Sequence, residues 1–328
     1  MTPAEAPTIE VDGLRTHFFT KSGLVKAVDG VSLAVRRGKI LGLVGESGSG
    51  KSITGFSILG LVDPPGRIVG GAIRFNGVDL ATLDSEALRQ LRGDRIAMIF
   101  QDPMMTLNPV LRVDTQMIEA VTAHRNIGRR EARDLAATAL AEVGIASPER
   151  RLSAYPHELS GGMRQRVAIA IAFINKPDLV IADEPTTALD VTIQAQILYE
   201  AQKLCRTRQT AMIWITHDLA IVSSLADRIA VMYAGRVVEE GATADVVGRP
   251  LHPYTRGLIG SVPSANRRGE RLMQIPGMTP SLLNLGPGCA FRSRCSRAGD
   301  DCRADPPVLS VAPARAVRCV RPLPGAEA

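Results

Sequence analysis

The stretch GESGSGKS, residues 45–52, decides the fold because it fits the G-x-x-x-x-G-K-[ST] pattern of a phosphate-binding loop. The apolar run KILGLVG before it predicts a buried parallel strand, and SITGFSILGLV after it predicts a helix. In that context, backbone N–H groups and a helix N-terminus converge on phosphate oxygens. We therefore expect Lys51 between the β- and γ-phosphates of a nucleotide, and the Ser52 hydroxyl on Mg²⁺. The predicted site residues are Gly45, Glu46, Ser47, Gly48, Ser49, Gly50, Lys51 and Ser52.

A second apolar strand, in DLVIADEP, ends in two carboxylates. A nucleotide site needs one carboxylate for Mg²⁺ and one group that organises the attacking water. Asp183 is placed to hold Mg²⁺ through water, and Glu184 is placed to act as the general base. A strand that ends in Asp-Glu is a weak signal alone, but the phosphate loop upstream makes it a strong one.

The segment ELSGGMRQRVAIAIAF predicts a helix with Ser160 as its N-cap, followed by two glycines. The exposed N–H groups at such a helix start form an anion site. Residues 45–52 already supply a phosphate-binding loop. We therefore expect this second anion site to close over a nucleotide that another subunit holds.

GESGSGKS, LVIADEP and LSGGMRQR together resemble the signature set of the ATP-binding-cassette (ABC) ATPases. The resemblance implies an α/β fold with a RecA-like core, an antiparallel β subdomain and a helical subdomain. It implies that Gln101 of IFQDP senses Mg²⁺ and the γ-phosphate, that Glu184 is the catalytic glutamate, and that His217 of WITHD is a switch histidine that contacts the γ-phosphate. TALD, residues 187–190, matches a dimer-contacting loop. The residues implied to contact ATP of the partner cassette are Ser160, Gly161, Gly162 and Asp190.

The family also stacks an aromatic residue on adenine, ahead of the first long strand pair. Phe19 is the candidate here, with Phe18 and His17 as rivals. Both phenylalanines could equally belong to the core of a strand.

The chain divides into an ATPase domain, residues 1–248, and a C-terminal extension, residues 249–328. Strand-like runs occupy the first 100 residues, a helix-rich part covers about 102–175, and strands then return. RIAVMYAGRVVEEG predicts a hairpin that turns at Ala234-Gly235. After about residue 248, prolines and glycines cluster and long periodic segments are absent, so we expect an appended module and not more of the same sheet.

The composition narrows the class of protein. No apolar run reaches the roughly 18–20 residues that cross a bilayer, and the N-terminus lacks the features of a secretory signal. A cytoplasmic protein is therefore expected. The net charge is +6, but the basic residues are scattered and aromatics make up 4%, so we expect no nucleic-acid partner.

Several stretches resemble the ATPase subunits of peptide and nickel importers, namely KAVDGVSLAV, FQDPMMTLNP, HPYTRGLIGSVP, IPGMTPSL and GCAFRSRC. This resemblance implies an ATP-hydrolysing subunit that drives uptake of di- or oligopeptides from the cytoplasmic face of the membrane, as a peripheral protein. Its implied partners are a second, paralogous cassette, two transmembrane permease subunits and an extracytoplasmic substrate-binding protein. A homodimer is the second choice for the cassette pair. The alternatives are an importer of nickel or another small solute, and a soluble ABC ATPase that acts on nucleic acid.

Four cysteines, spaced C-x5-C-x6-C-x16-C, gather in the extension at Cys289, Cys295, Cys302 and Cys319. The spacing differs from the usual zinc pairs, and iron–sulfur ligands vary more widely in spacing. Disulfides fit a cytoplasmic protein poorly, and four unligated thiols are the remaining possibility. The resemblance to peptide-importer ATPases favours a [4Fe–4S] cluster, with zinc as the alternative.

Overall fold

The computed structural model describes residues 6–187, 189–262 and 273–324, and these form two compact units. The first unit contains the residues up to Ile9, Val35–Ile40 and Thr82–Trp214. The second contains Glu10–Ala34, Leu41–Ala81 and the residues from Ile215 onward. Each unit is built from segments that lie far apart in the chain, so neither forms from a continuous stretch.

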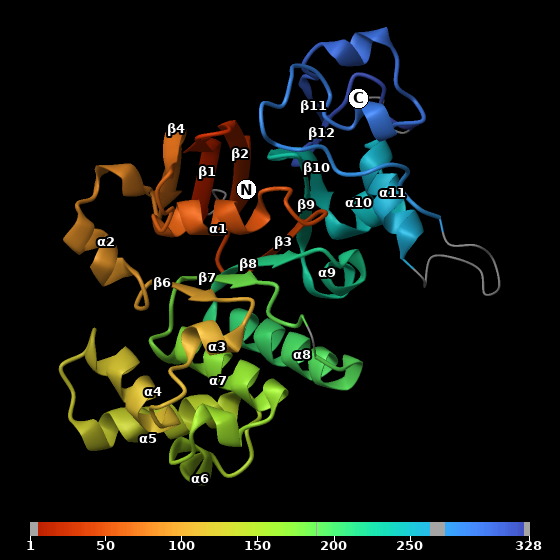
Figure 1. Ribbon diagram of the computed structural model, residues 1–328. Helices are drawn as coiled ribbons and strands as arrows, with labels where there is room; N and C mark the ends of the chain where they lie inside the picture. The colour runs from red at the N-terminus through yellow and green to blue at the C-terminus, as the bar shows by residue number, and fades with distance from the viewer. Residues whose placement is uncertain (1–5, 188, 263–272, 325–328) are drawn as a thin grey trace. The chain divides into compact units, whose positions relative to one another are not determined.

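The first unit combines short buried strands with a group of helices (Figure 1). Strand β7 (Leu179–Asp183) lies between β6 (Ile96–Ile99) and β8 (Ala211–Thr216), and β6 and β7 run parallel. Its helices are α2 (Ser85–Leu91), α3 (Pro103–Thr106), α4 (Val113–Thr122), α5 (Arg129–Glu142), α6 (Pro148–Leu152), α7 (Gly161–Ile174) and α8 (Val191–Arg208). Parallel strands joined through helices confirm the α/β class.

The spacing of apolar residues explains which faces of α5 and α7 are buried in the first unit. Helix α5 buries Ala132, Ala136 and Ala139, spaced three and four residues apart, so one face is apolar. Helix α7 is buried around most of its circumference, as expected for a helix packed on several sides. Helices α3 to α7 all lie within the range for which the sequence predicts helices.

The second unit contains two groups of paired strands. One has the order β2-β1-β4-β5, formed by β1 (Ile9–Thr20), β2 (Gly23–Val35), β4 (Gly66–Phe75) and β5 (Val78–Asp79). The other has the order β11-β12-β10-β9-β3, formed by β3 (Ile40–Val44), β9 (Arg228–Tyr233), β10 (Arg236–Ala242), β11 (Val308–Ala312) and β12 (Arg315–Arg318). Its helices are α1 (Lys51–Leu59), α9 (Leu219–Leu225), α10 (Thr243–Gly248) and α11 (Pro253–Ser261).

The predicted hairpin at residues 234–235 is confirmed. Strands β9 and β10 pair antiparallel, and Ala234 and Gly235 have φ values of 48° and 81°. Two successive positive φ angles suit a two-residue turn whose twist matches that of the strands.

The expectation that the tail adds nothing to the sheet is wrong. Strand β12 pairs antiparallel with β10, placing Val317 opposite Glu239, and β11 pairs with β12. Without them β10 would be an edge strand with unpaired N–H and C=O groups. The sequence signal was weak because both strands are short and β11 is largely exposed.

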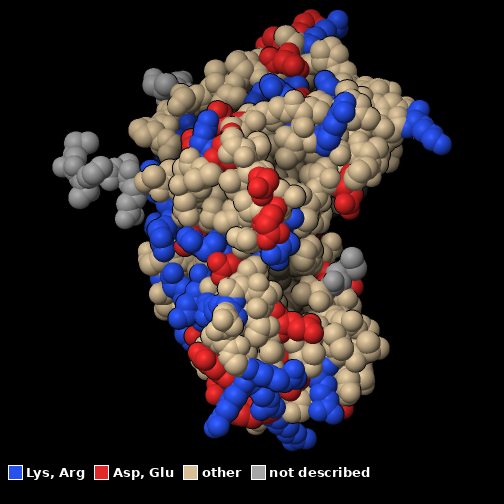
Figure 2. All heavy atoms as spheres, turned by 90° about the vertical axis from the view of Figure 1, so that its left-hand side faces the viewer, with Lys and Arg blue, Asp and Glu red and all other residues tan. Residues whose placement is uncertain are grey.

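Within the described part of the chain, no helix is both long and apolar enough to cross a membrane. On the face drawn in Figure 2, basic and acidic side chains are interspersed, in keeping with the scattered basic residues of the sequence.

A buried carboxylate joins the extension to β10. The Glu239 side chain is fully buried, and its two oxygens accept the N–H groups of Leu251 and His252, both at 2.8 Å. Arg315 of β12 lies 3.6 Å from the same carboxylate. Burial raises the pKa of Glu239, so these donors offset an unfavourable environment for its charge.

We predict that Glu239→Gln lowers the free energy of unfolding by about 1–3 kcal/mol, because an amide can accept only one of the two buried N–H groups. Urea denaturation measures the change. Glu10→Gln is the control, since the Glu10 carboxylate is about half exposed and pairs only loosely with Arg74, at 3.5 Å. Equal losses in the two variants would contradict the prediction.

Candidate nucleotide-binding site

The predicted phosphate loop lies between strand β3 and helix α1 in the second unit. Gly48 and Gly50 have φ values of 76° and 102°, in the region that favours glycine. A Cβ on Gly50 would lie 2.2 Å from the Ala27 carbonyl oxygen. The loop is therefore packed directly against the backbone of β2, which leaves no room for a side chain at this position.

The loop has the features that a phosphate group requires. Lys51 is buried, and its ammonium donates to the carbonyl oxygens of Gly45 at 2.8 Å and Glu46 at 3.0 Å. The Ser49 hydroxyl is fully buried and finds no hydrogen-bond partner among the described residues. Buried polar groups are normally paired, so this hydroxyl fits a site that takes a polar ligand. Ser52, half-buried, is the second residue of α1.

Phe19 is the most accessible of the three candidates for stacking on adenine. It is 45% exposed, and the Arg67 guanidinium lies 4.2 Å from the ring centroid. Phe18 is half-buried and packs at Gly66, and half-buried His17 lies 3.9 Å from Asp29. Phe19 therefore remains the preferred candidate.

Gln101 and Glu184, both predicted to take part in ATP hydrolysis, contact each other in the first unit. Asp183 is the last residue of β7 and is buried. Glu184 follows it with φ 44°, and its Oε2 accepts the Thr187 hydroxyl at 3.1 Å and the Gln101 amide at 3.5 Å. A non-glycine residue in the left-handed region is uncommon and is often found at functional sites. The structure thus brings Gln101 to Glu184, although the sequence separates them by 83 residues.

Ser160 and Asp190 cap two helices whose N-terminal ends lie side by side. The Ser160 hydroxyl accepts the N–H of Met163 at 3.3 Å at the start of α7, and Asp190 accepts the N–H of Ile193 at 2.9 Å at the start of α8. A Cβ on Gly162 would come within 2.7 Å of the Ile193 side chain. The predicted signature and dimer-contacting residues therefore form one surface of the first unit; Ala188 lies outside the described residues.

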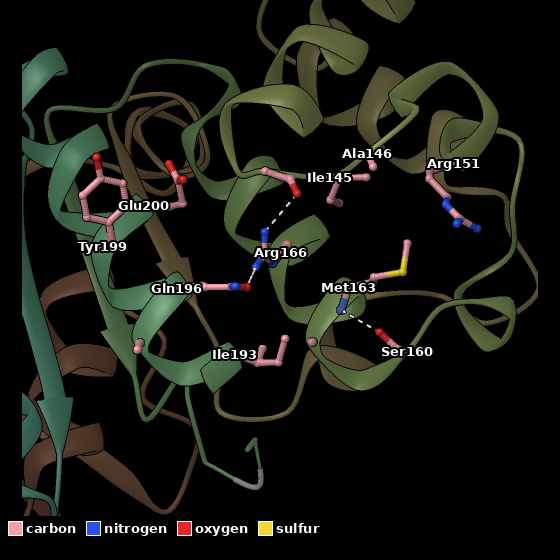
Figure 3. A pocket seen from close by; sticks show the side chains of 13 residues that line it. Ile145, Ala146, Arg151, Ser160, Met163, Arg166, Ile193, Gln196, Tyr199 and Glu200 are labelled. Carbon is pink, nitrogen blue, oxygen red and sulfur yellow. Dashed lines mark hydrogen bonds between the residues drawn. The ribbon is translucent and has the colours of Figure 1, made fainter. Parts of the chain in front are cut away.

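Arg166, the last residue of LSGGMRQR, was not among the predicted site residues, and its contacts anchor α7. Its guanidinium donates to the carbonyl oxygens of Val143 and Gly144, both at 3.0 Å. It also donates to Gln196 at 2.5 Å (Figure 3). Arg166, Gly144 and Gln196 line a cavity of about 710 Å³ between α7, α8 and the turn after α5. Arg166 thereby satisfies carbonyl groups at the end of α5 and links it to α8.

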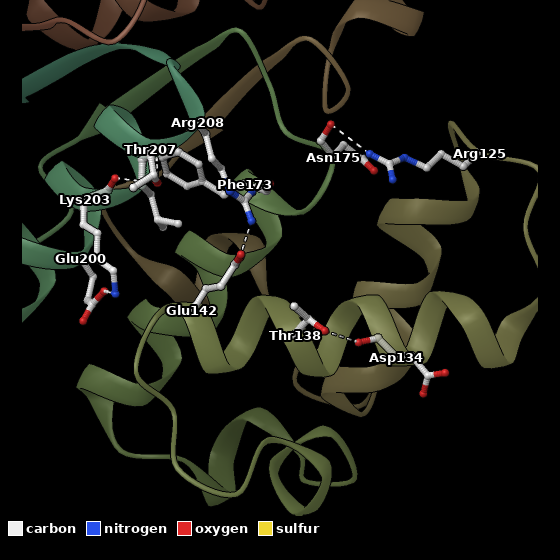
Figure 4. Close-up of polar contacts among 11 residues, drawn as sticks. Arg125, Asp134, Thr138, Glu142, Phe173, Asn175, Glu200, Lys203, Thr207 and Arg208 are labelled. Atoms are coloured by element: carbon white, nitrogen blue, oxygen red, sulfur yellow. Dashed lines mark hydrogen bonds and ion pairs between the residues drawn. The ribbon is translucent and has the colours of Figure 1, made fainter.

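The other end of α7 is held by two arginines (Figure 4). Arg208 donates to the Phe173 carbonyl at 2.5 Å and pairs with Glu142, and Arg125 donates to the Asn175 carbonyl at 3.1 Å. Terminal carbonyl groups of a helix lack partners within it, so these cations satisfy them and complement the helix dipole.

His217 directly follows β8 and is exposed in the second unit. Its neighbour Asp218 caps α9 by accepting the N–H groups of Ala220 at 2.8 Å and Ile221 at 3.4 Å. The cap fixes the backbone on the C-terminal side of His217. His217 shares this unit with the phosphate loop, whereas Gln101, Asp183 and Glu184 belong to the first unit.

All four cysteines of the extension line one small cavity, together with Phe291 and Arg321. They are free thiols, and Cys302 and Cys319 are buried. Burial raises the pKa of Cys289, and raises that of Cys319 to about 11, with the neighbouring cysteines adding to both shifts. Nevertheless, no group of three or more His, Cys, Asp or Glu side chains in the described ranges is arranged to hold a metal ion. The four donors converge without forming a ligand set.

The sequence also missed the partners of Glu46 in the phosphate loop. Arg294 donates to both carboxylate oxygens of Glu46, at 2.6 and 2.9 Å, and Thr279 donates to one of them at 2.7 Å. The Glu46 N–H donates to the Tyr254 hydroxyl at 2.9 Å. All three partners come from the extension, more than 200 residues away.

The phosphate loop, the two carboxylates at the end of β7 and the capped start of α7 are the features of an ATP-binding cassette. Residues 28–187 match the model of the ABC transporter family. A solved structure described as a dimeric bacterial ABC transporter cassette is 27% identical with a TM-score of 0.65, covering 72% of this chain and 98% of that one.

Residues 238–302 match the C-terminal region of oligopeptide/dipeptide transporters. The oligopeptide transport ATP-binding protein of Escherichia coli is 46% identical over 315 residues, covering 96% of this chain and 93% of that protein. That of Bacillus subtilis is 47% identical over 313 residues, covering 95% of each chain. The chain belongs to the ABC transporter family, in the group of ATP-binding proteins that carry the oligopeptide/dipeptide transporter C-terminal region.

We predict that Gly50→Ala weakens ATP binding at least tenfold, because the methyl group would overlap the Ala27 carbonyl and displace the loop. Gly77→Ala is the matched control: Gly77 also has a positive φ, of 83°, but a Cβ there meets no atom within 4 Å. That variant measures backbone strain alone, about 1–2 kcal/mol. Equilibrium binding of MgATP to the two variants distinguishes the overlap at Gly50 from backbone strain. An unchanged affinity in Gly50→Ala would refute the prediction.

Proposed function

We propose that this chain is the ATP-hydrolysing subunit of an importer for di- and oligopeptides. The observation that carries the proposal is the joint presence, in one chain, of the ABC site and the oligopeptide/dipeptide transporter C-terminal region. Similarity to peptide transport ATP-binding proteins extends over 95–96% of the chain, so the extension is included in it.

In this proposal the second unit binds the triphosphate of ATP. The residues of the loop are Gly45, Glu46, Ser47, Gly48, Ser49, Gly50, Lys51 and Ser52, and Phe19 stacks on adenine. Lys51 neutralises the β- and γ-phosphates, and His217 contacts the γ-phosphate. A solved ATP-binding cassette that is 26% identical is described as a post-hydrolysis state bound to ADP and Pi. This description supports the proposal that the chain binds a nucleotide.

The first unit supplies the groups for hydrolysis. Glu184 takes a proton from the attacking water, and the contact with Gln101 keeps its carboxylate oriented. Ser52, Gln101 and Asp183 would hold Mg²⁺, which supplies charge neutralisation at the phosphates. Ser160, Gly161, Gly162 and Asp190 would contact ATP bound by the partner cassette, since helix starts favour anions.

We propose a domain boundary near residue 248, with the ATPase domain at 1–248, its helical subdomain at about 102–175, and the extension at 249–328. Helices α3 to α7 support the limits of the helical subdomain. The match to the transporter C-terminal region begins at residue 238, ten residues ahead of the proposed boundary.

The proposed partners are a second, paralogous cassette, two transmembrane permease subunits and an extracytoplasmic substrate-binding protein. The chain would act as a peripheral protein at the cytoplasmic face of the membrane, without a nucleic-acid partner. The free-energy difference between the closed cassette pair with and without the γ-phosphate would drive the permease. An importer of nickel or another small solute is the second candidate, but the matched C-terminal region and the similar proteins are those of peptide transporters and favour the first.

We also propose that the four cysteines hold a [4Fe–4S] cluster, with zinc as the alternative. The presence of all four cysteines in the lining of one cavity supports the proposal. Holding a cluster would require deprotonated thiols and a closer arrangement of the four side chains.

We predict that Glu184→Gln lowers kcat for ATP hydrolysis by about 10²–10⁴-fold while ATP binding persists, because the amide cannot accept the proton of the attacking water. ATPase assays and equilibrium ATP binding on the assembled transporter give the two readouts. Glu86→Gln is the control, since the Glu86 carboxylate is exposed on α2. Full activity in Glu184→Gln would remove this residue from the mechanism.

Affinity purification from membranes tests the transport proposal. Permease subunits should co-purify, and the reconstituted complex should show ATP hydrolysis stimulated by peptide-loaded binding protein. Stimulation by a nickel chelate in place of peptide would support the second candidate. Recovery of nucleic acid that stimulates the ATPase would overturn both.

Anaerobic purification of the full chain with its partners tests the cysteine proposal. We expect a visible absorption band with about four iron and four sulfide per chain. The variant Cys302→Ser should lose it, whereas Cys205→Ser should not, because Cys205 lies in α8 of the first unit. A zinc-containing, colourless protein would select the alternative, and a metal-free protein with full ATPase activity would dispose of both.

A further inference from the structure

Three segments of the extension, far apart in sequence, meet at Glu46. Arg294 binds both carboxylate oxygens of Glu46, the Thr279 hydroxyl donates to one of them, and the Tyr254 hydroxyl accepts the Glu46 N–H. These residues lie in GCAFRSRC, IPGMTPSL and HPYTRGLIGSVP, the three tail stretches that the ATP chemistry leaves unexplained. Glu46 is itself the second residue of the phosphate loop.

The residues around Glu46 are rigidly held. The Arg294 side chain is only 5% exposed, and its Nε donates to the Pro276 carbonyl at 2.8 Å while Nη1 reaches the Tyr233 hydroxyl at 3.3 Å. Tyr254 is fully buried, with its ring centroid 4.5 Å from that of Tyr233. The guanidinium therefore has anchoring contacts that do not depend on its pair with Glu46.

The contact at Glu46 continues to the phosphate-binding lysine. The carbonyl of Glu46 accepts the Lys51 ammonium at 3.0 Å, while the side chain and N–H of the same residue face the extension. A displacement of Glu46 would thus move both the loop backbone and an anchor of Lys51. Burial alone would raise the pKa of Glu46, but the hydrogen bonds from Arg294 and Thr279 hold it below its ordinary value, so the carboxylate stays charged.

We propose that the C-terminal extension is a clamp on the phosphate loop, with Arg294 as a positioning residue that acts on ATP through Glu46. The clamp consists of Tyr254, Thr279 and Arg294. The inference rests on the proposed ATP site and gives the extension a part in nucleotide binding. A loop held in its binding geometry loses less conformational freedom when ATP arrives, and this raises affinity.

The clamp is also joined to the cysteine cavity through the backbone. Arg294 is the last residue of the short helix η4 (Arg292–Arg294), which lies between Cys289 and Cys295. Within this turn the Arg292 N–H donates to the Cys289 carbonyl at 3.0 Å, and the Cys295 N–H donates to the Arg292 carbonyl at 3.3 Å. The turn that carries Arg294 is therefore hydrogen-bonded through its backbone to Cys289 and Cys295.

A double-mutant cycle on the full chain tests the clamp. Arg294→Ala and Glu46→Ala should each raise the dissociation constant for MgATP about tenfold, because each removes the same charge-assisted pair. The double variant should bind no more weakly than either single variant, since the two residues act as one unit. In the assembled transporter, KM for ATP should rise with kcat changed less than about twofold.

Milder variants keep the test valid if Arg294→Ala fails to fold. Arg294→Lys retains the charge but loses the paired donors, and Thr279→Val removes one donor with little change of volume, so each should weaken binding less than the alanine variant. Arg303→Ala is the control from the same module, since its side chain is 75% exposed and pairs with Asp300 at the surface. It should bind ATP as the unchanged protein does.

These measurements distinguish failure of the clamp proposal from failure of the proposed function. If the unchanged protein neither binds nor hydrolyses ATP, the proposed function fails. If it binds ATP and the folded Arg294 and Glu46 variants bind equally well, the clamp is refuted. Losses that simply add in the double variant would also refute it, because they would show that the two residues act independently.

Discussion

A phosphate-binding loop must keep most of its N–H groups available for the ligand, so hydrogen bonds within the loop alone cannot hold its shape. The rest of the structure has to hold it from outside. Gly50 packs against the Ala27 carbonyl of β2, the Gly235 N–H of the hairpin turn donates to the Ser49 carbonyl at 2.9 Å, and Arg294 pairs with Glu46. Strand, turn and extension thus all meet at one loop, and each of these neighbours contributes to its geometry.

The same constraint shapes the first unit. In the proposed function the starts of α7 and α8 face ATP of the partner cassette, so contacts elsewhere on the two helices have to contribute to their stability. Arg166 links α7 to the end of α5 and to α8, and Arg208 satisfies a carbonyl at the far end of α7. The signature surface is therefore positioned by arginines that themselves need not touch ATP.

The extension gains a structural meaning from these contacts. It adds β11 and β12 beside β10, is anchored by the buried carboxylate of Glu239, and reaches the phosphate loop through Arg294. Its cysteines line one cavity at the base of the turn that carries Arg294. Hydrogen bonds and aromatic packing around Tyr233, Tyr254 and Phe291 hold this segment in place.

The sequence by itself determined the α/β class, the phosphate loop, the hairpin at 234–235 and the ABC family, because each depends on residues within a short stretch whose spacing follows from backbone geometry. Gln101 beside Glu184 could be expected only from the family resemblance. The pairing of β12 with β10, the anchoring by Arg166 and the contact of Arg294 with Glu46 were decided by the tertiary structure alone. Glu46 and Arg294 lie 248 positions apart, and no local pattern indicates which of many arginines will reach the Glu46 carboxylate.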